Sequence, residues 1–231
     1  MIRWEAPGPY EVVFSTRVGG VSEGPFDSLN LGRRSGDDVE RVDENRRRLC
    51  AAVGADAARL ALNLQVHGVT INRAVPGGRG VPGDGLWTDA PEVPMLALTA
   101  DCVPVALARS GGKPAAAVVH AGWIGVLAGA LQAGVRALGG HVAAAIGPSA
   151  GPCCYEVGPE VSFPYRERFG EGVVSGGKLD LWAAAEASLR NAGVEEVHRF
   201  DLCTICNPDL FFSHRRDGLP RGGQGVLALV T

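Results

Sequence analysis

Short apolar runs separated by glycine-rich segments dominate the hydrophobic pattern of this chain. Apolar or alternating runs bounded by turn residues are typical of β-strands. We predict strands over residues 11–15, 60–67, 70–75, 95–99, 115–120, 142–146, 194–202 and 225–230. A further apolar run at 103–107 follows Cys102, and Pro104 within it predicts a bend near that cysteine.

Apolar residues three or four positions apart predict helices. The predicted helices cover residues 37–53, the segment between Trp123 and Gly139, residues 158–169 and residues 180–192. In the first helix Val42, Leu49 and Val53 share one face. Segments 15–36 and 76–85 are glycine-rich and read as loops. A loop longer than about 15 residues is uncommon unless it is functional or disordered, so the first of these is a candidate for function.

Strands and helices are interspersed along the chain without repeats or linker-like segments, which predicts one mixed α+β domain over residues 1–231. The 231 residues and 46% apolar content suffice for one large core. A net charge of −3 argues against nucleic acid and acidic membranes as partners. We see no signal peptide and no apolar run of the ~18 residues that a membrane span needs, so we expect a cytoplasmic protein with reduced cysteines.

Candidate metal ligands stand beside small residues at the ends of three apolar runs: His67, Cys102 and His120. Two imidazoles and a thiolate with an open fourth position form a donor set that suits catalytic zinc. The gaps between them are too long for a zinc finger, so the fold itself would have to assemble the site. Two other interpretations are open. Each residue could simply pack in the core, or Cys102 and a histidine could form a metal-free hydrolytic pair.

Cys203 and Cys206 form a competing metal candidate, because their spacing suits half of a structural zinc site. No second close pair of ligands accompanies them in the sequence, since His214 stands alone eight positions later. The adjacent Cys153 and Cys154 read as structural residues.

Many ordered motifs together resemble one known family. They include Gly19-Gly20, Gln65-Val66-His67-Gly68, Thr99-Ala100-Asp101-Cys102, His120-Ala121-Gly122-Trp123, Gly151-Pro152-Cys153-Cys154-Tyr155 and Phe211-Phe212-Ser213-His214-Arg215-Arg216-Asp217-Gly218. The chain resembles, over nearly its whole length, the laccase-domain or multicopper polyphenol oxidase-like family, also described as purine nucleoside phosphorylases of the YfiH and YlmD type. The resemblance implies an α+β domain with mixed sheets stacked between helices, and one zinc ion bound by His67, Cys102 and His120.

The resemblance also implies zinc-dependent chemistry on purine nucleosides, with a nucleoside and phosphate as small-molecule partners. Adenosine deamination and phosphorolysis of adenosine, inosine and methylthioadenosine are attributed to the family. The alternatives are a copper-dependent polyphenol oxidase, a Cys–His amidase acting on cell-wall precursors, and a non-catalytic nucleoside-binding relative. Five histidines, of which two fall in the candidate site, argue against a multicopper centre, although a copper ion in place of zinc stays open.

Further residues are candidates for catalysis and substrate binding. Arg46 is the first choice for binding phosphate, with Arg17 behind it, because phosphate needs cationic donors. Asn30 and Trp123 are candidate substrate-binding residues, since Trp123 could stack on a purine. Phe212 is expected to lie in the core.

Asp101, Ile124 and Gly223 limit the catalytic roles that the sequence can support. Asp101 is next to Cys102, but on a strand its side chain would point to the opposite face. The chain departs from the family pattern at Ile124 and Gly223, where the family usually has arginine. Loss of an arginine near a helix N-terminus removes a possible anion contact, which weakens phosphorolysis more than zinc binding or deamination. The sequence leaves the oligomeric state open.

Overall fold

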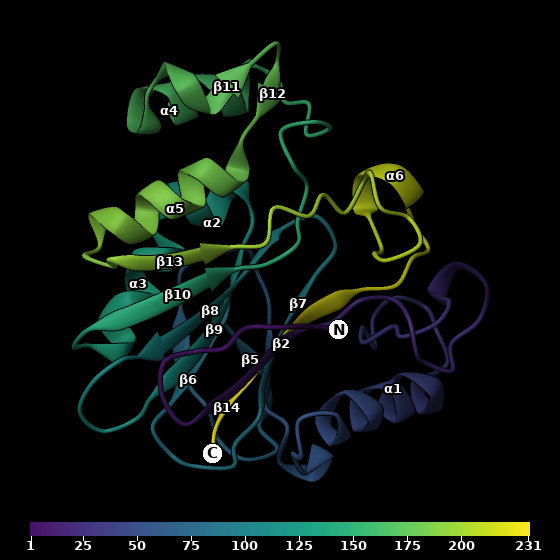
Figure 1. The fold of residues 1–231 in the computed structure, drawn as a ribbon. Coiled ribbons are helices and arrows are strands. Elements are labelled where there is room, and N and C mark those ends of the chain that lie inside the picture. Colours follow the sequence, from purple (N-terminus) through teal and green to yellow (C-terminus); the bar gives the residue numbers. More distant parts are fainter.

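Two β-sheets lie face to face at the centre of the fold, and helices cover their outer faces (Figure 1). The computed structural model describes residues 1–231. Its strands are β1 (Ile2–Arg3), β2 (Tyr10–Phe14), β3 (Leu62–Leu64), β4 (Ile71–Arg73), β5 (Arg79–Pro82), β6 (Gly85–Thr88), β7 (Met95–Thr99), β8 (Val103–Arg109), β9 (Ala116–Ala121), β10 (Val142–Ile146), β11 (Val174–Ser175), β12 (Lys178–Leu179), β13 (Glu196–Arg199) and β14 (Gln224–Val230).

The α-helices are α1 (Val39–Ala51), α2 (Trp123–Ala128), α3 (Ala130–Leu138), α4 (Pro159–Phe169), α5 (Leu181–Asn191) and α6 (His214–Asp217). Three 3-10 helices lie at Gly24–Phe26, Ala57–Arg59 and Glu171–Val173. The first central sheet has the strand order β1-β2-β14-β7 and the second has the order β13-β10-β8-β9-β6-β4. The second is mixed, because β13 and β4 pair parallel with their neighbours while the inner strands pair antiparallel.

Three apolar clusters divide the molecule into layers. The middle cluster joins the facing sides of the two sheets, the second lies between the six-stranded sheet and helices α2 to α5, and the third lies between the four-stranded sheet and α1. Alternation along β8 explains the division: Val105 and Leu107 face the helices, whereas Ala106 and Ala108 face the other sheet. The family resemblance implies mixed sheets stacked between helices, and this α+β architecture is confirmed.

Several elements differ in extent from the sequence prediction. The single helix expected after Trp123 is two helices, because Gly129 takes a left-handed conformation with φ of 94° between α2 and α3. The strand expected over 60–67 is confined to β3, and the glycine-rich segment 76–85 contains β5, which pairs with β3. The β3–β5 pairing is a long-range contact that local periodicity does not report, whereas the break after α2 follows from the backbone conformation of Gly129.

The chain changes sheets close to the candidate ligands. β7 belongs to the four-stranded sheet and β8 to the six-stranded sheet, so the segment 100–102 crosses from one to the other. Asp101 adopts φ of 88° at this crossover, which is the bend expected near Cys102. The strand nevertheless continues through Pro104, which lies opposite His120 in the β8–β9 register. None of the helices has both the length and the apolarity to cross a membrane.

The packing of α3 on the six-stranded sheet depends on Gly134. A Cβ atom there would lie 2.8 Å from Leu107 Cδ1 and 2.9 Å from Val119 Cγ2. We predict that Gly134→Val lowers the free energy of unfolding by about 1–3 kcal/mol through overpacking. Urea unfolding followed by circular dichroism measures this. Gly111→Val is the control, because a Cβ at Gly111 meets nothing within 4 Å, and an equal loss in both variants would contradict the argument.

Candidate functional site

The three predicted ligands, separated in sequence, converge in the fold. His67 lies in the turn after β3, Cys102 at the crossover before β8, and His120 near the end of β9. Their ligand atoms all lie within 4.8 Å of one another, and Cys102 Sγ is 4.0 Å from His67 Nε2. The two imidazole rings meet edge to face, with centroids 4.8 Å apart. The fold therefore assembles a compact donor set of two nitrogens and one sulfur.

Asp84 holds the two histidine-bearing segments together. Its buried carboxylate accepts hydrogen bonds from the backbone N–H groups of Val66, His67 and Gly68 at 3.2, 2.9 and 2.7 Å. His120 Nδ1 forms a hydrogen bond of 2.9 Å with the same carboxylate, and the Asp84 backbone carbonyl accepts the His120 backbone N–H at 2.7 Å. These bonds support the left-handed backbone of His67, whose φ is 59°.

Sequence reasoning missed the role of Asp84. Gly83-Asp84-Gly85-Leu86 is one of the motifs shared with the family, but the motif gave Asp84 no role, and no local spacing links it to a histidine 36 positions later. A carboxylate that receives one nitrogen of a metal-binding imidazole is a common second partner in metal sites, because it leaves the other nitrogen free to bind the ion. Although burial opposes the charged form, the His120 imidazole and the Gly68 and Val66 amides hold the pKa of Asp84 below its usual value.

Cys102 and His120 each stabilise the charged form of the other. Burial disfavours the thiolate, yet hydrogen bonds with His120 and His67 lower the pKa of Cys102 to about 6. Burial likewise disfavours the imidazolium, yet Asp84 and Cys102 raise the pKa of His120 to about 9. A thiolate is the form of cysteine that binds metals and acts as a nucleophile. Cys102 is therefore poised at neutral pH for either role.

The donor set fits a metal ion of the zinc type. Gly122 passes so close that a Cβ there would lie 3.0 Å from His67 Cδ2 and 3.2 Å from Cys102 Sγ. Only a glycine lets β9 turn into α2 without pushing these ligands apart. His67 is exposed and Cys102 partly exposed, so one side of the group is open. Three N and S ligands with an open side are the arrangement of catalytic zinc sites.

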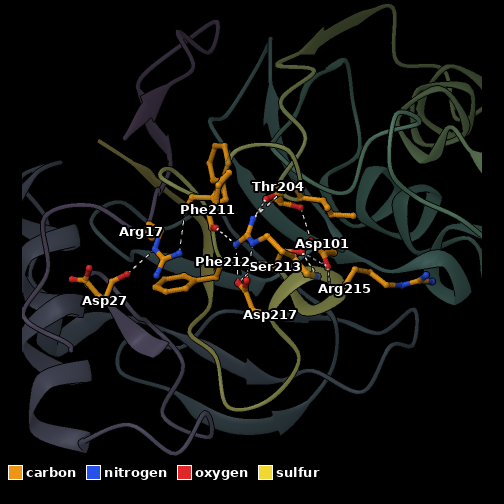
Figure 2. A network of polar contacts seen from close by, with 12 residues as sticks. Arg17, Asp27, Asp101, Thr204, Phe211, Phe212, Ser213, Arg215 and Asp217 are labelled. Carbon is orange, nitrogen blue, oxygen red and sulfur yellow. Dashed lines mark hydrogen bonds and ion pairs between the residues drawn. The ribbon is translucent and has the colours of Figure 1, made fainter. Parts of the chain in front are cut away.

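Asp101 does not face this group. Its carboxylate accepts hydrogen bonds from Thr204 Oγ1 at 2.6 Å, from Ser213 Oγ at 3.0 Å and from the Arg215 backbone N–H at 2.7 Å. Figure 2 shows the side chain turned into this network of C-terminal residues. The expectation that Asp101 points away from Cys102 is confirmed, although the cause is the crossover and not strand alternation. Asp101 thus anchors the backbone next to Cys102.

A cavity of about 450 Å³ opens over the His67–Cys102–His120 group. It is lined by the loop 32–35, strand β3, the start of β5, the crossover and the loop 219–223. Its arginines are Arg33, Arg34, Arg46, Arg79 and Arg221. No carboxylate lines it. The cavity therefore combines three metal-ligand side chains with a strongly cationic wall, which suits an anionic ligand.

Arg46 is the predicted phosphate ligand, and it lies in this wall. It is buried, and its Nε and Nη2 donate to the Leu31 carbonyl at 2.9 and 2.7 Å. Burial and the charges of Arg79 and Arg33 lower the pKa of Arg46 to about 10. Cations that disfavour one another's charge in this way would be stabilised by an anion placed between them.

Arg221 is a second arginine with unused hydrogen-bonding capacity, and sequence reasoning missed it. It stands two positions before Gly223, where the family pattern usually has arginine. Its Nε atom is buried without a hydrogen-bond partner, and burial lowers its pKa. A buried donor without a partner costs free energy that a ligand oxygen would recover. Only the fold could reveal this residue, because the loop 219–223 brings it to the cavity.

The remaining predicted site residues lie outside the cavity lining. Arg17 donates to the carbonyls of Asp27 and Pro208, and its guanidinium lies over the buried Phe212 ring (Figure 2). The buried Asn30 accepts the Gly223 N–H at 2.9 Å and so fixes a cavity-lining loop. Trp123 packs against the helix-covered core. Arg17 and Asn30 thus support the surrounding loops, whereas Trp123 packs on the helix-covered side of the six-stranded sheet.

Ile124, the first departure from the family pattern, is exposed at the start of α2 and does not line the cavity. Its neighbour Gly125 lies against the Gly68 carbonyl, where a Cβ would be 3.5 Å away. The absence of an arginine at position 124 therefore leaves the cationic wall described above intact. The expected weakening of phosphorolysis stays a prediction.

Comparison with known proteins identifies similar sequences and similar folds. Residues 11–231 match the sequence model of the family described as multi-copper polyphenol oxidoreductase laccase. The chain is 39% identical to a purine nucleoside phosphorylase of Pseudomonas aeruginosa, covering 92% of this chain and 90% of that protein. It is 36% identical to purine nucleoside phosphorylase YfiH of Escherichia coli K12, covering 93% and 92%.

Solved structures agree as well. A Neisseria meningitidis protein, NMB0706, superposes with a TM-score of 0.88 at 32% identity, over 99% of this chain and 98% of that one. YlmD from Geobacillus stearothermophilus also gives 0.88 at 32% identity, over 98% and 94%. The fold and site thus define a mixed α+β protein with a His–Cys–His group beneath a cationic cavity. The chain belongs to the multi-copper polyphenol oxidoreductase laccase family.

The site makes a testable prediction about Cys102 in protein treated with a chelator. Because its pKa is lowered to about 6, alkylation by iodoacetamide should rise with pH around a midpoint near 6, against about 8.5 for an ordinary cysteine. In Asp84→Asn the imidazolium of His120 loses its carboxylate, so the thiolate is less favoured and the midpoint should move to higher pH. Mass spectrometry of the Cys102 peptide measures the rate.

The control for that experiment is Asp201→Asn, which changes an exposed aspartate paired with Arg199. Its Cys102 midpoint should equal that of the parent protein. A midpoint near 8.5 in the parent, or the same midpoint in Asp84→Asn, would show that the His120–Asp84 pair does not govern Cys102.

Proposed function

We propose that this protein is a purine nucleoside phosphorylase that binds one zinc ion through His67, Cys102 and His120. The observation that carries the proposal is the single cavity that joins this donor set to five arginines. In phosphorolysis, phosphate is the anionic nucleophile and must lie next to the glycosidic bond. A cationic wall beside a Lewis-acid site can bind phosphate in that position. The relatives named purine nucleoside phosphorylase support the substrate class.

The arginines would bind phosphate and fix its direction of attack. Arg46 keeps Nη1 available after Nε and Nη2 bond to Leu31, and Arg221 offers its partnerless Nε. In the reaction a phosphate oxygen forms a bond to C1′ of the ribose while the bond from C1′ to the purine nitrogen breaks. The purine leaves with the electron pair of that bond and takes up the proton that phosphate releases. A fixed phosphate lowers the entropic part of the barrier.

The histidines and Cys102 would act at the other end of the substrate. Zinc bound there would supply a Lewis acid that stabilises developing negative charge. Asp84 keeps His120 in the tautomer whose Nδ1 proton faces the carboxylate, so that Nε2 is directed to the centre of the group. Gly122 keeps the ligands within reach of one another. The same contacts hold the three donors in place before substrate arrives.

Adenosine deamination is the second reaction that we propose for this donor set. Zinc deaminases use the same kind of ligands together with a glutamate that moves protons. No carboxylate lines the cavity, and Asp84 is occupied by His120 and three amides. We therefore expect deamination to be slower than phosphorolysis, with adenosine, inosine and methylthioadenosine as candidate substrates for the latter.

A copper oxidase, an amidase and a non-catalytic binding protein would each make different demands on the site. A copper polyphenol oxidase of the multicopper type needs several metal ions with many histidine ligands, whereas His141, His198 and His214 do not join the His67–Cys102–His120 group. A Cys–His amidase would use the thiolate of Cys102 without metal, and a non-catalytic relative would bind nucleoside without product. Metal analysis and product analysis separate these cases.

The phosphate role of Arg46 can be tested by Arg46→Lys. One charge-assisted hydrogen bond is worth about 1.5–3 kcal/mol, so we predict that KM for phosphate rises about tenfold or more while KM for the nucleoside changes little. Arg47→Lys is a matched control, since Arg47 is exposed on the same helix and pairs with Glu44. Equal effects on both KM values, or none in Arg46→Lys, would refute a phosphate contact.

The reaction itself is tested by chromatography of adenosine and inosine incubated with zinc-loaded protein. We expect free base and ribose 1-phosphate only when phosphate is present, and a loss of at least about 100-fold in Cys102→Ala, consistent with the several kcal/mol that a Lewis acid supplies. Inosine formed from adenosine without phosphate would instead support deamination. Full activity of Cys102→Ala, or no turnover in any condition, would refute the proposal.

A further inference from the structure

A second group of possible metal ligands lies outside the cavity. Cys153 and Cys154 lie in the loop between β10 and α4, and Cys203 and Cys206 lie in the loop after β13. All four sulfur atoms lie within 4.8 Å of one another. The sequence alone shows Cys203 and Cys206 as half of a zinc site without a second pair, and the fold supplies that pair.

The sheet topology explains why the two loops meet. β10 and β13 pair in parallel, so the loops that follow them leave the sheet at the same edge. A parallel bridge between Ser149 and Cys203 extends this pairing beyond the strands. The four cysteines therefore converge through the same backbone pairing that builds the six-stranded sheet, 49 to 53 positions apart in sequence.

The spacing of the sulfurs suits one ion. Cys206 Sγ lies 3.3 Å from Cys153 Sγ and 3.1 Å from Cys154 Sγ. Zinc–sulfur bonds of about 2.3 Å in a tetrahedron place the sulfurs about 3.8 Å apart, which is longer than the two Cys206 contacts and shorter than the 4.8 Å within which all four sulfurs lie. A cluster of several irons is larger and would hold its thiolates farther apart.

The surroundings favour a negatively charged centre. Four thiolates around a divalent ion carry a net double negative charge, and such a centre is stabilised by donors and cations nearby. The Gly151 backbone N–H donates to Cys203 Sγ at 3.3 Å. Lys178 Nζ binds the Cys153 carbonyl at 2.7 Å, and Arg216 Nη1 binds the Thr204 carbonyl at 2.7 Å. Cations thus brace both cysteine loops.

We propose that Cys153, Cys154, Cys203 and Cys206 bind one zinc ion in a structural tetrathiolate site, separate from the His67–Cys102–His120 group. Two of the thiols, Cys153 and Cys206, are exposed, so the ion can enter without unfolding of the protein. The proposal does not rest on the proposed function, because none of these four residues lines the cavity.

Such an ion would also steady the backbone beside Cys102. Thr204 lies between the ligands Cys203 and Cys206, and its hydroxyl donates to Asp101 at 2.6 Å (Figure 2). The Asp101 carbonyl in turn accepts the Ala150 N–H from the segment leading to the first cysteine loop. Cross-linking the two loops therefore fixes two of the partners of Asp101, Thr204 and Ala150, and the left-handed backbone of Asp101 precedes Cys102.

The decisive experiment uses Cys102→Ala, which removes the thiolate of the cavity site and leaves the four cysteines intact. The protein is purified under reducing conditions, loaded with zinc and passed through a desalting column. We expect one zinc per chain by mass spectrometry of the elements. X-ray absorption at the zinc edge should show four sulfur ligands at about 2.3 Å and no nitrogen ligand.

Variants then locate the ion. Cys206→Ser in the Cys102→Ala background should lose the tightly held zinc, while Cys50→Ser, which changes a buried free cysteine elsewhere, should keep it. Chelation should lower the melting temperature of Cys102→Ala and leave that of the Cys206→Ser double variant unchanged. The first measurement needs no cysteine of the cluster to be altered, so it stands even if that double variant does not fold.

Several outcomes would overturn the proposal. They are Cys102→Ala protein without bound metal, zinc with nitrogen among its ligands, iron–iron scattering from a cluster, and peptide mapping that finds disulfides among the four cysteines after purification with reductant. A single iron with four sulfur ligands would overturn the choice of zinc. Phosphorolysis by the parent protein has no bearing on any of these results.

Discussion

The carboxylate of Asp84 is the constraint on which the cavity site depends. It lies at the beginning of the β6 segment, faces the turn after β3 and receives the imidazole of His120 from β9. One buried negative charge therefore fixes the position of both histidines. Burial of a carboxylate is costly unless hydrogen bonds satisfy it, and here three backbone amides and one imidazole do so. The hydrogen bonds that make burial of this carboxylate favourable are therefore the same bonds that position the two histidine ligands.

The site also stands where the chain passes between its two sheets. The segment before Cys102 crosses from the four-stranded to the six-stranded sheet, and Asp101 secures it to residues near the C-terminus. The cationic wall is built from different segments: the loop 32–35, the helix residue Arg46 and the loop that carries Arg221, and Asn30 holds both loops. The cavity residues thus come mainly from several loops, and the two sheets hold these loops in fixed positions relative to one another.

The predictable part of the structure was the part governed by local pattern. The strand at 95–99 matched in full, and helices near α1, α4 and α5 followed from apolar periodicity. The predicted helix after Trp123 was wrong in its continuity, because the left-handed Gly129 breaks it. Residue types and motifs singled out three candidate ligands that the fold brings together, and Arg46, which the fold places in the cavity wall; their roles stay predictions. The roles of Asp84 and Arg221 were missed, since both depend on contacts or placement that only the fold sets.

The sequence by itself determined the order of strands and helices and, through its motifs, the family to which the chain belongs. It also determined that two imidazoles and a thiolate stand at the ends of apolar runs. Only the tertiary structure decided which of these residues meet. Parallel pairing of β10 with β13 joined two cysteine pairs that looked unrelated, and the packing of the helices on the six-stranded sheet left Trp123 against the apolar cluster there rather than in the cavity. Local pattern reports burial and backbone conformation, whereas a site requires distances between side chains that only the packed fold sets.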